Sequence, residues 1–152
     1  MINWLGPRLR GDDVLVGDMV STQKRILLAK MGLDCHDTGI VTVAQQLREN
    51  GFEVIYLGLH NNAEQVVKAA IEEDVDAIGI SFLSGQHMAQ TRMLSEAMKA
   101  DSVELPVICG GVIPDDDADE MRAMGVSEVI RPGTLTEEIL VLVNRALGPV
   151  EA

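Results

Sequence analysis

The sequence predicts a single α/β domain built on a parallel sheet. Five short apolar runs alternate with five segments of helical periodicity along 152 residues, a length that suits one compact domain. The runs are apolar throughout instead of at every second residue, which is typical of parallel strands covered on both faces. Right-handed crossovers wind such a chain into a doubly wound five-stranded sheet with helices on both faces. Five strands favour the flavodoxin-like (Rossmann-like) order 2-1-3-4-5.

Each expected strand is a short run rich in aliphatic residues. The first run reads KRILLAK, and the fourth, LPVICGG, ends in two glycines. Runs of this length between turn-forming residues suit buried strands better than helices. We place the five strands at residues 24–30, 53–58, 76–81, 105–111 and 127–131.

Each expected helix carries apolar residues on one face and a start or stop signal. Asn62, followed by Gln65, resembles a capping box, and Thr136 is an expected N-cap. Gly51 and Gly148 follow two of the segments as stop signals, and acids open the fourth segment, where they suit a helix N-terminus. The segments that contain these helices, with their capping and stop residues included, are residues 40–50, 61–74, 88–100, 115–125 and 135–148.

The domain is expected to occupy residues 23–148. Residues 1–22 fit no element and are expected to form an irregular N-terminal extension, and residues 149–152 a short C-terminal tail. No apolar run is long enough to span a bilayer, and the start lacks the apolar core of a secretory signal. Two cysteines, Cys35 and Cys109, make neither a disulfide framework nor a zinc site. We therefore expect a cytoplasmic protein with reduced thiols.

The charge of the chain excludes two classes of partner. Lys and Arg number 12 and Asp and Glu 24, which gives a formal net charge of -12. Nucleic acids and anionic membrane surfaces both require basic residues, so neither is an expected partner. The acidity is best explained by solubility.

Polar and small residues gather where the expected strands end. In folds of this kind, ligands bind beyond the carboxyl ends of the strands, near the switch point between the first and third strands. The segment after the first strand, MGLDCHDTG, contains Asp34, Cys35 and His36. The segments after the third, fourth and fifth strands, SFLSGQH, GGVIP and RPGTLT, are rich in glycine, which lets a ligand approach the backbone closely. His36 is therefore expected at the functional edge of the sheet.

The residues around His36 leave its role open. A general acid or base is one option, although no second catalytic base stands out. Zinc is disfavoured because the adjacent Cys35 and His36 point at one ion only with difficulty and no other Cys/His cluster has ligand spacing. Another option is a single axial ligand to a metal held by a macrocycle, with Asp34 accepting a hydrogen bond from the other ring nitrogen. The last option is a solvated surface histidine.

Three classes of protein that share this fold are disfavoured because the chain lacks residues that they need. A phosphoacceptor receiver domain needs an aspartate at the end of the third strand, where this chain has Ser81. A flavodoxin needs a Ser/Thr-rich phosphate loop after the first strand and aromatic rings for the flavin, whereas the loop has only Thr38. A dinucleotide-binding fold needs G-x-G-x-x-G after the first strand, which is absent.

Three motifs in order carry a family resemblance. They are DCHDTG after the first strand, SFL after the third and GG after the fourth, and LAKMGLD, CGGVIP and PGT around them are also similar. Over residues 24–147 the chain resembles the cobalamin-binding domain of adenosylcobalamin-dependent acyl-CoA mutases, the methylmalonyl-CoA mutase group, whose signature is D-x-H-x-x-G, S-x-L and G-G. D-x-H-x-x-G alone is a weak signal, but the three together on the expected strands are a strong one.

The resemblance implies a site. His36 would be the lower axial ligand of cobalt in cobalamin bound with its benzimidazole base displaced, and Asp34 would be the hydrogen-bond partner of His36. The displaced nucleotide tail would enter a cleft between the first and third strands. The other cofactor-binding residues would be Cys35, Asp37, Thr38, Gly39, Val43, Ser81, Leu83, Gly110, Gly111, Gly133 and Thr134. The chain departs from the family pattern at Cys35 and Thr38, where many relatives have glycine and arginine.

The resemblance also implies a partner. Acyl-CoA mutases need a CoA-binding barrel, and a barrel of about 250 residues does not fit in this chain. The chain would therefore be a cobalamin-binding small subunit that rearranges methylmalonyl-CoA or a related branched acyl-CoA together with a large subunit, and it would be inactive alone. The alternative is a stand-alone cobalamin carrier or sensor. His60 and His87 are expected to be polar loop residues near the subunit interface.

Overall fold

The computed structural model describes residues 23–31, 38–82 and 85–148. Within them, five strands alternate with five helices, as the sequence predicts. The elements in chain order are β1 (Arg25–Met31), α1 (Thr38–Glu49), β2 (Glu53–Asn61), α2 (Ala63–Glu72), β3 (Ala77–Phe82), α3 (His87–Ala100), β4 (Val107–Gly111), α4 (Asp115–Ala123), β5 (Glu128–Ile130) and α5 (Thr136–Leu147).

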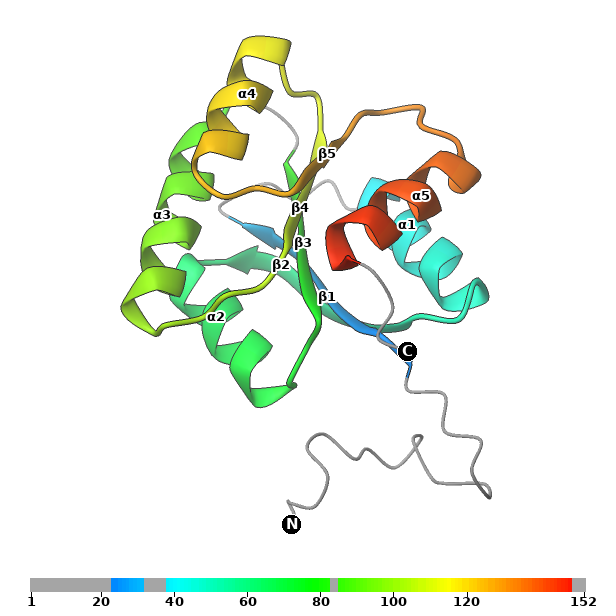
Figure 1. Ribbon diagram of the computed structural model, residues 1–152, viewed down its shortest axis with the longest axis horizontal. Coiled ribbons are helices and arrows are strands. Elements are labelled where there is room, and N and C mark those ends of the chain that lie inside the picture. The colour runs from blue at the N-terminus through cyan, green and yellow to red at the C-terminus, as the bar shows by residue number, and fades with distance from the viewer. Residues whose placement is uncertain (1–22, 32–37, 83–84, 149–152) are drawn as a thin grey trace.

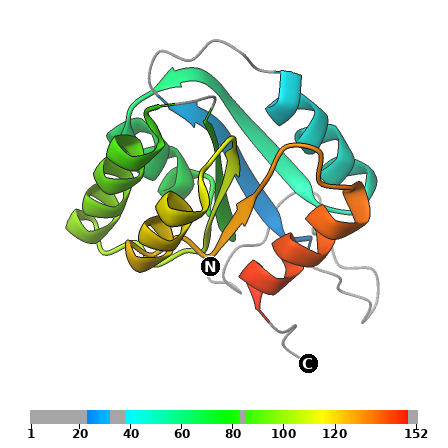
Figure 2. The same ribbon diagram turned by 90° about the horizontal axis from the view of Figure 1, so that it is seen from above.

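The sheet has the predicted topology. Its strand order is β2-β1-β3-β4-β5, and all four pairings are parallel. Figures 1 and 2 show α1 and α5 on one face of the sheet and α2, α3 and α4 on the other. Because the chain reverses its winding direction between β1 and β3, the carboxyl ends of these two strands border the place where such folds bind ligands.

The two faces of the central strand β3 differ in side-chain size. Ala77 belongs to the core under α1 and α5, whereas Ile78, Ile80 and Phe82 belong to the core under α2, α3 and α4. Successive side chains of a strand point to opposite faces, so Gly79 shares the face of Ala77. One strand thus presents large side chains to one helix layer and small ones to the other.

Strand β2 is longer than the sequence predicts. It runs on to Asn61, and the segment 59–61, expected as a loop, pairs with the end of β1 through two register shifts. Gly58 and His60 have positive φ angles of 90° and 63° there. The Asn61 side-chain amide donates hydrogen bonds to the carbonyl oxygens of Lys30 at 3.1 Å and Gly58 at 2.9 Å. These bonds hold an irregular extension that a simple apolar pattern does not reveal.

Of the two N-cap predictions, one is confirmed and one is wrong. Asn62 and Gln65 form a reciprocal capping box at the start of α2, as predicted. Thr136 is not the N-cap of α5, because Leu135 occupies that position with an extended backbone. The hydroxyl of Thr136 instead accepts a hydrogen bond from the side chain of Gln46 in α1 at 2.8 Å. A tertiary contact has replaced the local one.

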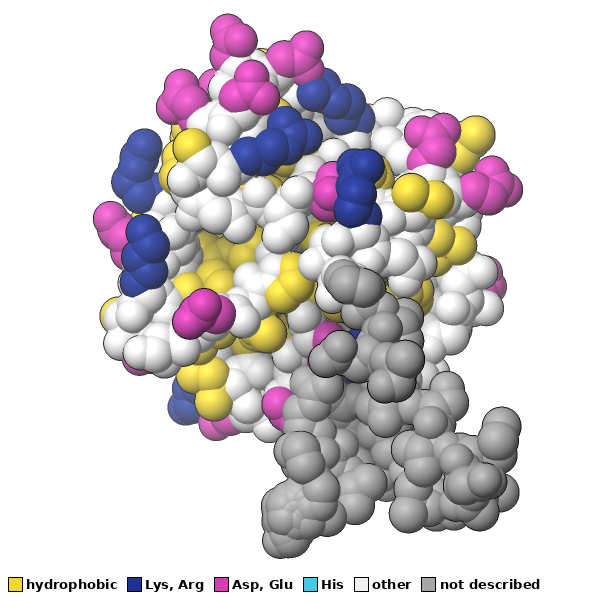
Figure 3. All heavy atoms as spheres, in the orientation of Figure 1, with side chains coloured by type: hydrophobic (Ala, Val, Ile, Leu, Met, Phe, Trp, Pro, Cys, Tyr) yellow, Lys and Arg dark blue, Asp and Glu magenta, His cyan; other side chains and the backbone are white. Residues whose placement is uncertain are grey.

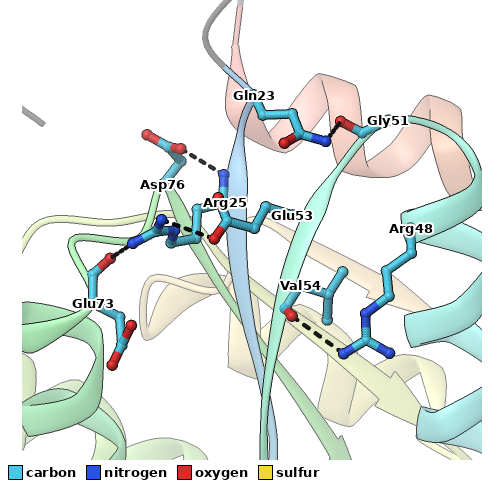
Figure 4. A network of polar contacts seen from close by, with 8 residues as sticks. All are labelled: Gln23, Arg25, Arg48, Gly51, Glu53, Val54, Glu73 and Asp76. Atoms are coloured by element: carbon cyan, nitrogen blue, oxygen red, sulfur yellow. Dashed lines mark hydrogen bonds and ion pairs between the residues drawn. The ribbon is translucent and has the colours of Figure 1, made fainter. Parts of the chain in front are cut away.

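The amino ends of the central strands are closed by a polar network centred on Arg25 (Figure 4). Its guanidinium group lies 2.8 Å from the carboxylate of Glu53 and donates to the carbonyl of Glu73 at 2.7 Å. Its backbone N–H donates to the carboxylate of Asp76 at 2.7 Å. These contacts connect β1 to β2 and to the turn before β3, and they stabilise this edge of the sheet.

The surface is rich in charges. Asp115, Asp116 and Asp117 open α4, and Figure 3 shows acidic side chains gathered over that helix with basic ones beside them. Arg131 pairs with Asp115, and Arg122 lies 3.4 Å from Asp119, which is three residues earlier in α4.

No helix in the described part of the chain has the length and apolar character needed to cross a bilayer.

Candidate functional site

A cavity of about 600 Å³ opens between α1, α5 and the carboxyl ends of the central strands. We call it the slot. Its wall is mostly apolar, and its residues come from four of the five strands, from α1 and α5, and from the loops after β4 and β5. They are Leu28, Gly39, Ile40, Thr42, Val43, Gln46, Gly79, Ile80, Ser81, Phe82, Ile108, Gly110, Gly111, Val112, Ile130, Arg131, Pro132, Gly133, Thr134 and Ile139.

Glycines keep the slot open. A Cβ atom at Gly79 would lie 2.5 Å from Cδ2 of Leu28, and one at Gly110 would lie 3.6 Å from the carbonyl oxygen of Ile130. Gly111 has φ of +137°, and a Cβ atom there would lie 2.0 Å from the carbonyl oxygen of Phe82. A side chain at Gly111 would therefore clash with backbone, whereas a side chain at Gly79 would have to displace the side chain of Leu28, another wall residue of the slot.

The structure brings most of the described sequence-predicted residues to the slot. The members in its wall are Gly39, Val43, Ser81, Gly110, Gly111, Gly133 and Thr134. Thr38 is the first residue of α1. Asp34, Cys35, His36, Asp37 and Leu83 lie outside the described residues. Segments that are far apart in sequence thus meet around one cavity.

Lys30 is a residue of this edge that the sequence analysis did not single out. Its side chain is buried at the end of β1, with 2% relative exposure. The ammonium group donates to the hydroxyl of Ser81 at 3.2 Å and lies 3.4 Å from the Ser81 carbonyl oxygen. Burying an ammonium group is costly unless polar atoms surround it, and Ser81 supplies two such atoms at the end of β3. The sequence offered one signal for this residue, which is a lysine inside an otherwise apolar strand.

The loop after β5 is shaped by its own hydrogen bonds. Thr134 donates its hydroxyl to the carbonyl oxygen of Arg131 at 2.6 Å, and its backbone N–H bonds to the same oxygen at 3.3 Å. Gly133 has a φ of +81°, which glycine adopts without strain. This tight turn brings Gly133 and Thr134 to the rim of the slot.

The expectations for the two described histidines need correction. His60 is exposed, as a loop residue would be, but it belongs to strand β2. His87 is the first residue of α3 and is buried, with its Nε2 2.7 Å from a carboxylate oxygen of Asp117 in α4. Its ring also lies edge-on to Phe82, with centroids 6.5 Å apart. His87 therefore joins α3, α4 and β3 inside the protein and is no polar loop residue.

The titratable groups of the described part show no nucleophile at the slot. Burial raises the pKa of the Cys109 thiol to about 12, so it stays protonated. A hydrogen bond from Arg145 lowers the pKa of Glu128, which lies on β5 at the edge of the sheet. Among the described residues no three His, Cys, Asp or Glu side chains converge as metal ligands would. The described wall of the slot is thus better suited to binding a ligand than to reacting with it as a nucleophile.

Comparison with known proteins assigns the family. The B12 binding domain family matches residues 24–141. The chain belongs to the B12-binding domain family. It is 45% identical over 123 residues to the 2-hydroxyisobutanoyl-CoA mutase small subunit of Aquincola tertiaricarbonis, covering 80% of this chain and 90% of the relative. It is 43% identical over 124 residues to the pivalyl-CoA mutase small subunit of Xanthobacter autotrophicus, covering 82% of this chain and 83% of the relative. The chain is thus a member of the acyl-CoA mutase small subunits.

Larger proteins contain the same B12-binding unit. The chain is 36% identical over 130 residues to the methylmalonyl-CoA mutase large subunit of Propionibacterium freudenreichii, of which it spans 18%. Among solved structures, a cobalamin-binding protein from Desulfitobacterium hafniense matches with a TM-score of 0.71 and 24% identity, over 83% of this chain and 60% of that one. The receiver domain of NarL from Mycobacterium tuberculosis matches with a TM-score of 0.65 and 13% identity, over 85% of this chain and 100% of that one. At these identities the two structures show the fold alone.

The chemistry of the slot fits one part of B12. The nucleotide tail of cobalamin ends in a flat, apolar heterocycle followed by a polar sugar and phosphate. Gly79 and Gly110, which have no side chains, form part of the slot wall beside the central strands, where a flat ring could lie. Ser81 and Thr134 offer hydroxyl groups nearer the rim. A mostly apolar cavity with few polar groups is typical of sites that bind such a ligand.

Proposed function

We propose that the chain is the cobalamin-binding small subunit of an adenosylcobalamin-dependent acyl-CoA mutase, an isomerase that is inactive without its large subunit. The observation that carries the proposal is the glycine-walled slot at the switch point between β1 and β3. It occurs in a chain that matches mutase small subunits over most of their length. The fold by itself would not carry this conclusion, since receiver domains share it.

The proposed binding mode has two parts. The nucleotide tail lies in the slot, against Gly79, Ser81 and Gly110, with its base displaced from cobalt. His36 takes the lower axial position on cobalt, and Asp34 accepts a hydrogen bond from its other ring nitrogen, which fixes the tautomer. Cys35, Asp37, Thr38 and Leu83 complete the contacts around the ring system.

The work of the protein is binding and orientation. When bound, adenosylcobalamin supplies a cobalt–carbon bond whose homolysis starts the radical rearrangement. His36 would bind the cobalt, and the slot walls would hold the nucleotide tail, so that this chain would orient the cofactor toward the partner. Val112 and Leu135, both 61% exposed at the carboxyl edge of the sheet, suit contact with that partner.

The proposed partner is a large subunit with a CoA-binding barrel. The two similar small subunits serve mutases named for different branched acyl groups, 2-hydroxyisobutanoyl and pivalyl. Similar small subunits paired with different substrates indicate that selectivity for the acyl group lies in the large subunit. We therefore propose a branched acyl-CoA as the substrate class, with the particular acyl group set by the large subunit.

Absorbance titration with cobalamin tests the proposal. The chain should bind cobalamin and convert its spectrum to the form with the benzimidazole base displaced and histidine on cobalt. His36→Ala should change that spectrum, while His60→Ala, an exposed histidine of β2, should not. Identical spectra of the wild type and His36→Ala would refute the axial ligand.

Reconstitution tests the catalytic part. Mixed with a large mutase subunit and adenosylcobalamin, the chain should support isomerisation of a branched acyl-CoA. Cobalamin binding without isomerisation with any such subunit would favour a stand-alone carrier or sensor, which is the second candidate function.

A further inference from the structure

The register of the strands shows how the sheet side of the slot is layered. Ser81 pairs with Gly110 in an outer row of the slot wall, near the carboxyl ends of β3 and β4. Two residues further into the sheet, Leu28 pairs with Gly79 and Gly79 with Ile108, and all three belong to the wall. We call these three residues the inner row. Side chains two positions apart on a strand share a face, so the inner row lies about 7 Å further from the mouth than the outer row.

The slot ends at the inner row on its sheet side. Ile26 and Ala77 form the next row of the same face, and they are buried in the core under α1 and α5 with 1% and 0% relative exposure. Neither is among the described residues of the slot wall. The part of a ligand that enters furthest along the sheet therefore meets the aliphatic side chains of Leu28 and Ile108, whereas the hydroxyl of Ser81 lies one row nearer the mouth.

Within the inner row, the side chain of Leu28 lies against Gly79. A Cβ atom at Gly79 would lie 2.5 Å from Cδ2 of Leu28, whereas carbon atoms in contact are about 3.5–4.0 Å apart. The nearest backbone atoms, the carbonyl oxygens of Leu27 and Ile108, would be 3.8 and 3.9 Å away. The leucine thus occupies the space beside the glycine, and its length determines how much room remains at this end of the slot.

We propose that Leu28 limits the size of the heterocyclic base that the slot accepts at the end of the cobalamin tail. The inference rests on the proposed function, since it requires the tail in the slot. Dimethylbenzimidazole carries its two methyl groups on the edge opposite the ring nitrogens, one of which bears the sugar. A base that enters ahead of its sugar therefore brings the methyl edge to the inner row. There Leu28 packs against the methyl groups and leaves no room for a third ring.

Binding measurements with three corrinoids test this proposal. The probes are cobalamin, a cobamide whose base is naphthimidazole and so has a third ring beyond the methyl positions, and cobinamide, which lacks the whole nucleotide. The ratio of dissociation constants between a variant and the wild type is compared for each probe, because this ratio cancels the cost of displacing the base from cobalt. Leu28→Ala should weaken cobalamin binding about 5-fold, tighten binding of the naphthimidazole cobamide about 10-fold and change cobinamide binding by less than about 2-fold.

Leu27→Ala is the matched control. Leu27 is the neighbouring residue of β1 and is also buried, but it belongs to the core under α2, α3 and α4. The same truncation there should lower stability and change the ratio for each probe by less than about 2-fold. Thermal unfolding identifies any variant that fails to fold. Leu28→Val and Leu27→Val then replace the alanine pair, and Leu28→Val should shift the ratios in the same directions by smaller factors.

The outcomes separate the two proposals. Opposite changes for cobalamin and the naphthimidazole cobamide would support the role of Leu28, because general damage to the site weakens both. Changes in the same direction for these two probes, or no change for either, would overturn the inference and leave the proposed function standing. Opposite changes in the Leu27 variant would overturn it as well, because the effect would not come from the slot. A wild-type chain that binds none of the probes would refute the proposed function itself.

Discussion

The same strands serve different purposes on the two faces of the sheet. Under α2, α3 and α4, Ile78 and Ile80 of β3 pack into a continuous core with Leu94 and Met121. Under α1 and α5, β3 presents small side chains, and the slot occupies the space that larger ones would fill. Because the side chains of a strand alternate, one strand can stabilise the fold with one face and shape a binding site with the other. On β3, the large side chains pack into the core that stabilises the fold, and the small ones border the cavity where a ligand would bind.

The largest expected effect comes from filling the slot. Gly79→Val adds two methyl groups and a Cβ atom to the slot wall, and the nearest atom, Cδ2 of Leu28, belongs to a side chain that can move. Affinity for cobalamin should fall by about 100-fold or more while the fold persists, since close-packed sites do not accept overlapping atoms. Absorbance titration measures the affinity, and circular dichroism monitors the fold. The control is Ile78→Val on the opposite face of β3, which should leave binding unchanged.

Truncation on the two faces should separate stability from binding. Leu94 is buried on the filled face with 2% exposure, so Leu94→Ala should lower the free energy of unfolding by about 2–5 kcal/mol. Val43→Ala, at the half-buried wall of the slot, should cost less than about 1 kcal/mol, because the site is already open to one side. Urea unfolding measures both. Equal costs would show that the slot face contributes as much to stability as the filled face.

The buried histidine belongs to the filled face and should act on stability. His87→Ala removes the 2.7 Å contact with Asp117 and the edge contact with Phe82, so the free energy of unfolding should fall by about 1–3 kcal/mol. Asp117→Asn keeps a carbonyl oxygen that can accept from the ring N–H, and it should cost less than Asp117→Ala. Urea unfolding of the three variants checks the order. A large loss of cobalamin affinity at unchanged stability would instead connect His87 to the slot.

The smallest effect is expected at the edge strand β5. The hydrogen bond from Arg145 lowers the pKa of Glu128 below its ordinary value of 4.5, so the folded protein binds this proton more weakly than the unfolded chain. The ion pair therefore stabilises the fold above the unfolded pKa and loses its effect as the pH falls through the folded pKa. Glu128→Gln should lower the melting temperature slightly at about pH 7 and by less at a pH well below 4.5, as calorimetry can check. An unchanged difference at both pH values would contradict the role of the pair.

Much of the fold was readable from local pattern. The strand order, the alternation of elements and the Asn62 capping box all follow from periodicity and short-range chemistry. The extension of β2 and the start of α5 did not follow, because both depend on contacts between distant segments. Asn61 bonds to Lys30 of the neighbouring strand, and Thr136 bonds to Gln46 of another helix.

The candidate site divides in the same way. The motifs after the strands predicted that Gly39, Ser81, Gly110 and Thr134 would come together, because parallel strands end at one edge, and the structure places all four around the slot. The partners of Lys30, His87 and Gln46 were not predictable, because each bond spans at least 30 positions of sequence. His36 and Asp34 lie outside the described residues, and their role stays a prediction from the motif.

The sequence by itself determined the family, the sheet order and the edge that carries the site, because hydrophobic periodicity and motif order are properties of the linear chain. Only the tertiary structure decided which face of the sheet is hollow and which polar groups line the cavity. The register of strand pairing and the packing of the helices determine these features. Both depend on the volumes of side chains that come from distant segments of the sequence. Gly79 shows the difference: in the sequence it is one glycine in a strand, and in the fold its missing side chain makes room for Leu28 in the wall of the slot.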